Sequence, residues 1–243
     1  MKILPLMNFR INNQPMSDKN NRYCLQKIGY DTFTASLKDV FDVFPDFGTH
    51  KFFRQNLDIL KSPQEIEHQI KLTAKEINKS YPPNEPLVAI CVLRGGVPFF
   101  QNLVRYLDMP VNMEFISVSS YGSGLKSSGK VKISGKIPDV NGLNVLLVDD
   151  VMDSGNTMSA LTKYFKDSGA KEVKTAVLFN KPDKRVESCK DLEPDFYGFS
   201  EKNAPFLIGY GLDLFGYGRG LPYIGAAKPE FLKKLTAHGL LDN

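Results

Sequence analysis

The chain has 243 residues, of which 42% are hydrophobic and 24% charged, as is typical of a folded protein with one large α/β domain or one domain and an extension. Lys and Arg number 31 against 27 Asp and Glu, a mild excess that argues against a nucleic-acid-binding surface. The three cysteines lie far apart without Cys-x-x-Cys spacing, which argues against a disulfide framework and a structural zinc site. No apolar run approaches the roughly eighteen residues of a membrane span, and the N-terminus lacks a signal peptide's apolar region, so we expect a cytoplasmic protein.

Residues 1–56 have weak hydrophobic periodicity, many Asn and Asp residues, and scattered aromatic side chains. Disordered segments are poor in aromatic residues, so we expect an irregular N-terminal extension that packs on the main domain. A helix is predicted to begin at Ser62-Pro63-Gln64-Glu65, because this order supplies an N-cap serine, a proline at the first helical position and a glutamate three residues after the cap. Its apolar stripe runs to about residue 79.

Strands and helices then alternate along the chain. A loop is expected at residues 121–130, which are rich in Gly and Ser. The alternation predicts a mainly parallel sheet covered by helices on both faces. The predicted strands are 87–92, 113–119, 131–133, 145–148, 173–179, 196–199 and 206–208, and the predicted helices are 97–107 and 157–166.

One segment combines several features of a ligand site at the end of a predicted strand. The apolar run 145–148 is followed by Asp149 and Asp150, by Asp153, and by the turn Ser154-Gly155-Asn156-Thr157. Backbone N–H groups and hydroxyls at a helix N-terminus bind phosphate, and the carboxylates suit ribose hydroxyls, a divalent cation or proton transfer. Simple helix capping by Asp153 or Ser154 would explain one carboxylate but not three. No Walker A loop or Gly-x-Gly-x-x-Gly fingerprint occurs as an alternative.

This segment resembles the phosphoribosyl-pyrophosphate signature of the type I phosphoribosyltransferases, and most closely that of the hypoxanthine-guanine enzymes. Three further blocks agree: LVAICVLRGGVPF (87–99), SVSSYGSGLKSSGKVKI (117–133), and PDFYGF (194–199) followed by GYGLDLFGYGRGLPYIGAAKPE (209–230). The resemblance implies an α/β fold in which helices flank a mainly parallel twisted sheet, with a small hood. The phosphoribosyltransferase domain would occupy residues 57–243, after an N-terminal extension (1–56) without an assigned role.

The resemblance implies transfer of the 5-phosphoribosyl group from phosphoribosyl pyrophosphate to N9 of hypoxanthine, and of guanine as the second expected base, with Mg²⁺ required. The transition state is similar to an oxocarbenium ion, because positive charge develops on the ribose as pyrophosphate leaves. Family members form homodimers or homotetramers. Two alternatives remain open, a transferase for xanthine and a catalytically weak nucleotide-sensing regulator of the same fold. Residues 1–56 could also serve as an interaction module.

The resemblance also assigns roles to individual residues. Asp153 matches the general base at the purine N7, and Arg94, Gly95 and Arg219 match pyrophosphate contacts. The implied phosphoribosyl-binding residues are Asp149, Asp150, Ser154, Gly155, Asn156 and Thr157, and the implied Mg²⁺ ligands are Asp213, Asp149 and Asp150. The sequence departs from the family at Asn156, where some relatives carry lysine, and at Gly218, a place that is usually aromatic.

For the purine, Lys181 matches the lysine that donates to O6, Phe196 the aromatic residue that stacks on the ring, and Tyr197 a neighbour of the base. Lysine donates hydrogen bonds but cannot accept them, so it fits an oxygen at C6 and not the amino group of adenine. Without the resemblance, a solvated lysine and a core phenylalanine would be the simpler interpretations. Ser120 and Tyr121 match the start of a closing loop, which would exclude water from the reaction.

Overall fold

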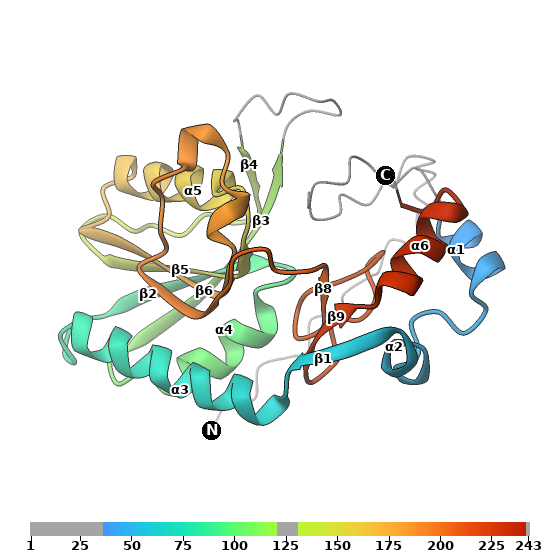
Figure 1. Cartoon of the computed structure of the whole chain (residues 1–243). Helices are drawn as coiled ribbons and strands as arrows, with labels where there is room; N and C mark the ends of the chain where they lie inside the picture. The colour runs from blue at the N-terminus through green and yellow to red at the C-terminus, as the bar shows by residue number, and fades with distance from the viewer. Residues whose placement is uncertain (1–35, 121–130, 242–243) are drawn as a thin grey trace, which may run out of the picture.

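The structure is a computed structural model, and it describes residues 36–120 and 131–241. Within these residues the main sheet has the strand order β4-β3-β2-β5-β6-β7 (Figure 1). Neighbouring strands are parallel except for β3 and β4, which are antiparallel, so the predicted mainly parallel sheet is confirmed. The strands are β2 (Leu87–Leu93), β3 (Val111–Ser120), β4 (Val131–Ser134), β5 (Asn144–Met152), β6 (Glu172–Asn180) and β7 (Phe196–Ser200).

Helices cover both faces of this sheet. On one face lie α3 (Pro63–Ser80) and α4 (Val97–Val104), and on the other lies α5 (Asn156–Asp167) (Figure 1). Successive residues of β2 point into different cores, because Ala89 and Cys91 pack with α3 and α4 whereas Val88 and Ile90 pack with α5. Burial on both faces explains why the sequence of this strand is continuously apolar.

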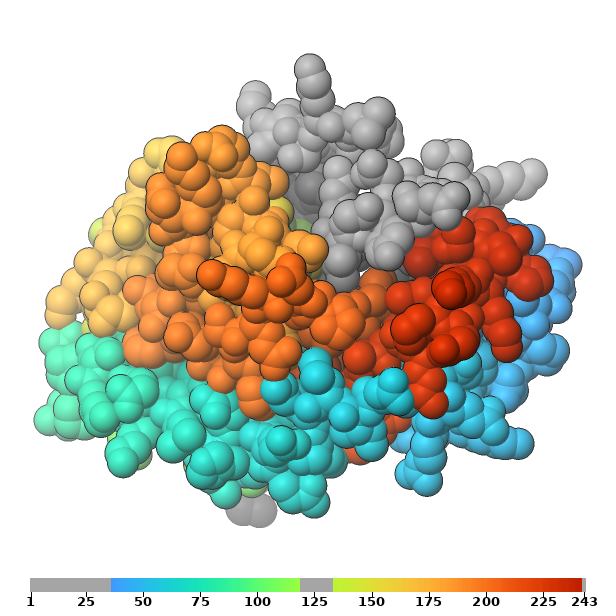
Figure 2. Space-filling model, viewed as in Figure 1, coloured from blue at the N-terminus to red at the C-terminus, as the bar shows by residue number. Residues whose placement is uncertain are grey.

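A second, smaller unit forms the hood. Its antiparallel sheet has the order β1-β9-β8, from β1 (Leu57–Lys61), β9 (Ile224–Ala227) and β8 (Leu207–Ile208). Three helices pack in the same core: α1 (Leu37–Val43), α2 (His50–Asn56) and α6 (Pro229–Ala237). Figure 2 shows the blue N-terminal segment lying against the red C-terminal segment at one end of the molecule.

Several predicted elements differ from the observed ones. The strand predicted at 206–208 belongs to the hood and not to the main sheet, and residues 36–56 contain two capped helices instead of irregular chain. The helix predicted to reach residue 107 ends at Val104, because Tyr106 and Leu107 turn back to the carbonyls three residues before them. The predicted start of α3 is confirmed, with the Ser62 hydroxyl accepting from the Glu65 N–H at 3.3 Å and the Ser62 N–H donating to the Glu65 carboxylate at 2.8 Å.

Two short 3₁₀ turns follow β6, at Pro182–Lys184 (η1) and Glu187–Cys189 (η2). They lie between the end of β6 and the start of β7, beside the amino end of α5. Among the described residues, no helix is long and apolar enough to cross a lipid bilayer.

Candidate active site

The carboxyl ends of the parallel strands meet at one edge of the main sheet, where α/β folds bind ligands. The pairing of β2 with β5 ends at Cys91 and Val148, and Asp149 and Asp150 follow this last pair while still inside β5. The turn Arg94–Gly96 follows β2 and lies against the Asp150 carboxylate and the backbone of Asp149. Asp149 and Asp150, predicted to follow the strand, are therefore held by its backbone pairing with β6.

Glycine is required in that turn because the Asp150 carboxylate and the backbone of Asp149 lie so close to it. A Cβ atom on Gly95 would lie 1.8 Å from Oδ2 of Asp150, and one on Gly96 would lie 3.1 Å from the Cα of Asp149. The Leu93–Arg94 peptide bond is cis. The close approach at Gly95 places the backbone of the turn against the Asp150 carboxylate.

The hood contributes a compact loop, residues 209–221, which we call the hood loop. Gly211 lies on the Gly95 carbonyl, since a Cβ there would be 2.1 Å from that oxygen. Arg219 pairs with the buried Asp213 (Nη2 to Oδ1, 2.5 Å) and donates to the carbonyl of Gly211 at 2.6 Å. The Gly216 N–H donates to the second oxygen of Asp213 at 2.7 Å. Gly95 of the main sheet and Arg219 of the hood, both predicted to bind pyrophosphate, therefore lie on either side of Gly211.

Burial dominates the electrostatics of this acidic cluster. It raises the pKa values of Asp149, Asp150 and Asp213, and the charge of Asp150 raises the pKa of Asp149 further. The Arg219 guanidinium acts in the opposite direction on all three carboxyl groups. Two buried carboxylates and the partly buried Asp149 face Arg219, with Arg94 acting on Asp213 as well, so negative charge is in excess, which is the environment that a bound cation stabilises.

The turn from β5 into α5 forms an anion site. The N-cap residue of α5 is Gly155 in a left-handed conformation (φ +82°), and no side chain caps the helix. Of the simple alternative, capping by Asp153 or Ser154, the structure shows only a weak contact, in which the Ser154 hydroxyl accepts from the Asn156 N–H at 3.4 Å. A Cβ at Gly155 would lie 2.9 Å from the Cβ of Cys189, so the turn also needs glycine for packing. The other N–H groups of the first turn have no side-chain partner among the described residues and are available to a phosphate.

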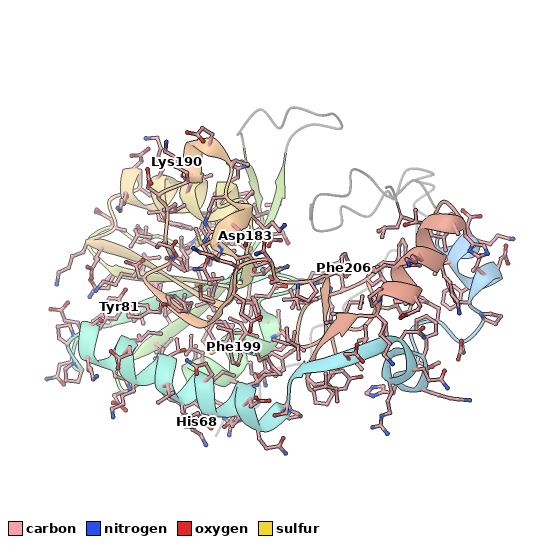
Figure 3. All side chains as sticks on the ribbon, viewed as in Figure 1. His68, Tyr81, Asp183, Lys190, Phe199 and Phe206 are labelled. Carbon is pink, nitrogen blue, oxygen red and sulfur yellow. The ribbon has the colours of Figure 1, made fainter. Side chains whose placement is uncertain are left out.

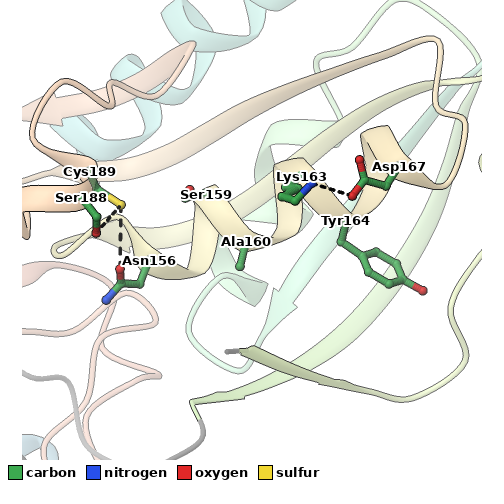
Figure 4. A pocket seen from close by; sticks show the side chains of 8 residues that line it. All are labelled: Asn156, Ser159, Ala160, Lys163, Tyr164, Asp167, Ser188 and Cys189. Atoms are coloured by element: carbon green, nitrogen blue, oxygen red, sulfur yellow. Dashed lines mark hydrogen bonds and ion pairs between the residues drawn. The ribbon is translucent and has the colours of Figure 1, made fainter. Parts of the chain in front are cut away.

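Asn156 contributes its backbone to this turn and not its side chain. Its N–H donates weakly to the Ser154 hydroxyl at 3.4 Å, whereas its side-chain oxygen faces the Cys189 thiol at 3.8 Å (Figure 4). The side chain lines a hollow on the outer face of α5 together with Lys163 and Tyr164. Asn156 therefore contributes no side-chain cation to the anion turn.

Asp153 and Lys181 face each other behind the anion turn. Lys181 directly follows β6 and is fully buried, and its Nζ lies 3.6 Å from Oδ1 of Asp153. Neither atom has a hydrogen-bond partner among the described residues. Burial raises the pKa of Asp153 and lowers that of Lys181, and each group partly offsets the effect on the other. A buried donor and a buried acceptor without partners form a pair of positions that a polar ligand would satisfy.

Arg185 is a site residue that sequence reasoning missed. Its guanidinium donates to the carbonyl oxygens of Met152 (2.6 Å), Asp153 and Leu192 (3.0 Å), and to that of Lys181 at 3.2 Å. It also donates to the Asn180 side chain. Most of these acceptors are backbone atoms of other segments, so no local motif could have identified the residue. Arg185 fixes the turn that carries Asp153 and the turn that carries Lys181.

The structure does not bring Phe196 and Tyr197 together with Lys181. Phe196 pairs with Ala176 at the amino end of β7, five positions before Lys181 along β6, which is about 16 Å of strand. Its ring packs against the main core, and Tyr197 is 47% exposed. The expectation of ring stacking by Phe196 therefore gains no support. Phe206, labelled in Figure 3, lies where the chain passes from β7 into the hood.

The structure describes the backbone at Ser120 and at Gly218, but not Tyr121. Ser120 is the last residue of β3, and Tyr121 with the rest of the predicted closing loop lies outside the described residues. At Gly218 (φ +89°), a Cβ would lie 2.6 Å from Cγ2 of Ile208 and 3.2 Å from Cζ of Phe53. Phe53 of α2 therefore occupies the space into which a larger residue 218 would extend.

A parallel α/β sheet with an uncapped helix N-terminus, buried carboxylates and a buried lysine at its carboxyl edge defines a protein that handles a phosphorylated, nucleotide-like ligand. Residues 56–213 match the family model described as the phosphoribosyl transferase domain. The chain is 42% identical over 171 residues to the hypoxanthine-guanine phosphoribosyltransferase of Aquifex aeolicus, covering 70% of this chain and 94% of the relative. It is 40% identical over 172 residues to the Bacillus subtilis enzyme of the same name, covering 70% and 93%.

Solved structures agree with these relatives. A crystal structure of a hypoxanthine phosphoribosyltransferase from Staphylococcus aureus superposes with a TM-score of 0.69 at 29% identity, covering 75% of this chain and 97% of the other. The chain belongs to the phosphoribosyltransferase family, in its hypoxanthine-guanine branch. The predicted family, fold class and enzyme class are thereby confirmed.

Proposed function

We propose that the protein transfers the 5-phosphoribosyl group of phosphoribosyl pyrophosphate to N9 of hypoxanthine and guanine, forming IMP or GMP and pyrophosphate in purine salvage. The observation that carries this proposal is the buried pair of Lys181 and Asp153 behind the anion turn, whose facing atoms have no hydrogen-bond partner in the described part of the chain. A 6-oxopurine has its O6 acceptor and its N7–H donor side by side on one edge. Lys181 matches the acceptor and Asp153 the donor. Adenine would face Lys181 with an amino group, leaving two donors opposed.

In this proposal the chain's own residues divide the reaction between them. N–H groups of the turn at residues 154–157 hold the 5′-phosphate, and Asp149 and Asp150 orient the ribose. As N9 bonds to C1′ and the bond from C1′ to the pyrophosphate oxygen breaks, the purine becomes more acidic and Asp153 accepts its N7 proton. Arg219 and the Gly95 turn stabilise the leaving pyrophosphate.

We propose Mg²⁺ as the cofactor, held by Asp149, Asp150 and Asp213. In the described part of the chain, no group of three or more His, Cys, Asp or Glu side chains is placed to hold a metal ion, so the donor phosphates would have to supply the other ligands. Mg²⁺ sites commonly combine one or two carboxylates with substrate phosphates, and buried carboxylates with raised pKa values fit this donor set. When bound, the ion would neutralise the pyrophosphate charge.

The decisive assay mixes the purified protein with phosphoribosyl pyrophosphate and Mg²⁺. Hypoxanthine, guanine, xanthine and adenine are then tested one at a time as the acceptor base. We expect turnover of hypoxanthine and guanine and none of adenine. Turnover of xanthine alone would support the alternative of a xanthine transferase. Absence of turnover with every 6-oxopurine would leave the nucleotide-sensing regulator as the better hypothesis.

Replacing Lys181 by Met should raise the KM for hypoxanthine about 10- to 100-fold, because a charged hydrogen bond to O6 is lost. The KM for phosphoribosyl pyrophosphate should change little. The Lys181 charge also lowers the pKa of Asp153, so its removal should move the acid limb of kcat/KM to higher pH. Steady-state kinetics across pH measure both effects. Lys184→Met, at a more exposed lysine in η1, is the control for the hypoxanthine KM, and an unchanged hypoxanthine KM in Lys181→Met would contradict the assignment.

We further propose a compartment, an assembly, a closing loop and a domain boundary for the protein. The thiols of Cys91 and Cys189 are free and buried, which supports a reducing compartment such as the cytoplasm. A homodimer or homotetramer stays a prediction, as does the closing role of Ser120 and Tyr121. We place the phosphoribosyltransferase domain at residues 57–243, because the family match begins at residue 56.

A further inference from the structure

We propose that the N-terminal helices, residues 37–56, position the hood loop and thereby set the affinity for the pyrophosphate part of the donor. The inference rests on the proposed function, and it concerns a segment that precedes the family match beginning at residue 56. The positioning residues are Phe41 and Phe47, which act through Tyr217 and Phe215.

Tyr217 lies in the middle of the hood loop, between the two residues that face the donor. Asp213 and Arg219 form their ion pair on either side of it. Leu214 and Tyr217 exchange backbone hydrogen bonds at 2.9 and 3.0 Å, which closes the chain between them into a tight turn. A displacement of Tyr217 would therefore move both ends of this ion pair.

The N-terminal helices enclose the ring of Tyr217. Phe41 meets it edge-on with ring centroids 5.8 Å apart, and Phe47 does so at 5.4 Å. Gly48, between α1 and α2, lies on the same ring, because a Cβ there would be 2.5 Å from Cδ1 of Tyr217. Each edge-to-face aromatic pair contributes about 0.5–1.5 kcal/mol beyond the burial of its area.

The hood loop needs such support because its backbone is strained. Phe215 has φ +54° and Tyr210 has φ +48°, in a region that bulky residues avoid. Conformations of this kind persist only where the surroundings hold them. Phe215 is 4% exposed, and its ring meets that of Phe47 at 5.8 Å, so part of those surroundings comes from the N-terminal helices.

The chain offers a matched pair of variants for the test. Phe41 and Phe44 both lie on or next to α1, and both are partly buried in the hood core. Phe41 contacts Tyr217, whereas Phe44 contacts Phe52, Phe231 and His238. The two substitutions to alanine remove the same atoms from the same core but on different sides.

In the full-length protein, Phe41→Ala should raise the KM for phosphoribosyl pyrophosphate and the inhibition constant of pyrophosphate by about three- to ten-fold, the equivalent of one aromatic pair. The KM for hypoxanthine should stay within about two-fold, because Lys181 and Asp153 belong to the main sheet. Phe41→Leu, which keeps apolar bulk, should recover part of the loss. Phe44→Ala should leave all three constants near their wild-type values.

The inference would be overturned if Phe41→Ala and Phe44→Ala changed the KM for phosphoribosyl pyrophosphate and the pyrophosphate inhibition constant equally, or if neither variant changed them. This outcome requires that the wild-type protein is active. Inactive wild-type protein would instead remove the proposed function on which the inference rests. If Phe41→Ala fails to fold, Tyr217→Leu removes the same contact from the hood loop and should give the same selective rise for the two pyrophosphate-bearing ligands. A parallel rise for hypoxanthine in that variant would count against the proposal.

Discussion

Replacing Asp153 by Asn should lower kcat by about 10²- to 10⁴-fold while leaving the dissociation constant of phosphoribosyl pyrophosphate nearly unchanged. The amide keeps the shape of the carboxylate but cannot accept the N7 proton, and Asp153 lies behind the anion turn and not among its N–H donors. Single-turnover kinetics measure the rate of the chemical step, and equilibrium binding measures the dissociation constant of phosphoribosyl pyrophosphate. Equal losses in both quantities would assign Asp153 to donor binding.

The same variant has a pH signature. A general base acts in its ionised form, so kcat/KM should fall as the pH drops through the pKa of Asp153. Burial raises that pKa above the ordinary aspartate value of 3.8, and the acid limb should therefore lie above that value. Asp153→Asn should lack the limb. Asp183→Asn, in η1 close to Lys181 in the chain, removes a more exposed carboxylate and should retain it (Figure 3). A limb that survives in Asp153→Asn belongs to another group.

Gly95→Ala should reduce kcat/KM for phosphoribosyl pyrophosphate by at least about 100-fold, an effect comparable to the loss of an oriented binding group. The added methyl group would lie 1.8 Å from Oδ2 and 2.4 Å from Cγ of Asp150, so that carboxylate or the whole turn must move. Asp150 has little freedom, because it is 6% exposed and its Oδ1 accepts from the Val151 N–H at 2.8 Å. Steady-state kinetics with thermal unfolding as a fold check measure the result.

Gly220→Ala is the control for Gly95→Ala. Gly220 is adjacent to Arg219 and exposed, and a methyl group added there would meet no described atom within 4 Å, so kinetics close to wild type are expected. A Gly95→Ala enzyme with near-normal kinetics would show that the turn is loose. In that case the close approach of Gly95 to Asp150 would have no role in holding the donor.

Features that depend on neighbouring residues could be predicted from the sequence. The helix start at Ser62 was predictable because both partners of its capping box lie within three residues of each other. The acidic residues at the end of β5 followed from an apolar run that only a buried strand explains. The placement of Asp153 beside Lys181 came only from the family resemblance, because 28 residues separate the two in the chain.

Features that depend on distant pairing could not be predicted. Leu57 in β1 pairs with Ala227 in β9, and neither short strand shows a periodic pattern that would identify its partner. The position of Phe196 was unpredictable for a related reason, because strand register decides which end of β7 reaches the site. Arg185 escaped notice because its acceptors are mainly carbonyl oxygens, which every residue possesses.

The arrangement around Arg185 has a thermodynamic consequence for the two substrates. The Arg185 guanidinium donates to the carbonyl oxygens of Met152 and Lys181. One side chain therefore holds both the segment that leads into the anion turn of the donor and the segment that carries the purine-binding lysine. When phosphoribosyl pyrophosphate binds and orders the anion-turn segment, the segment that carries Lys181 should become more ordered as well. Thermodynamic linkage requires the purine to have the same effect on the binding of phosphoribosyl pyrophosphate. Phosphoribosyl pyrophosphate and the purine are therefore expected to bind with positive cooperativity, and a shorter side chain at position 185 would uncouple them.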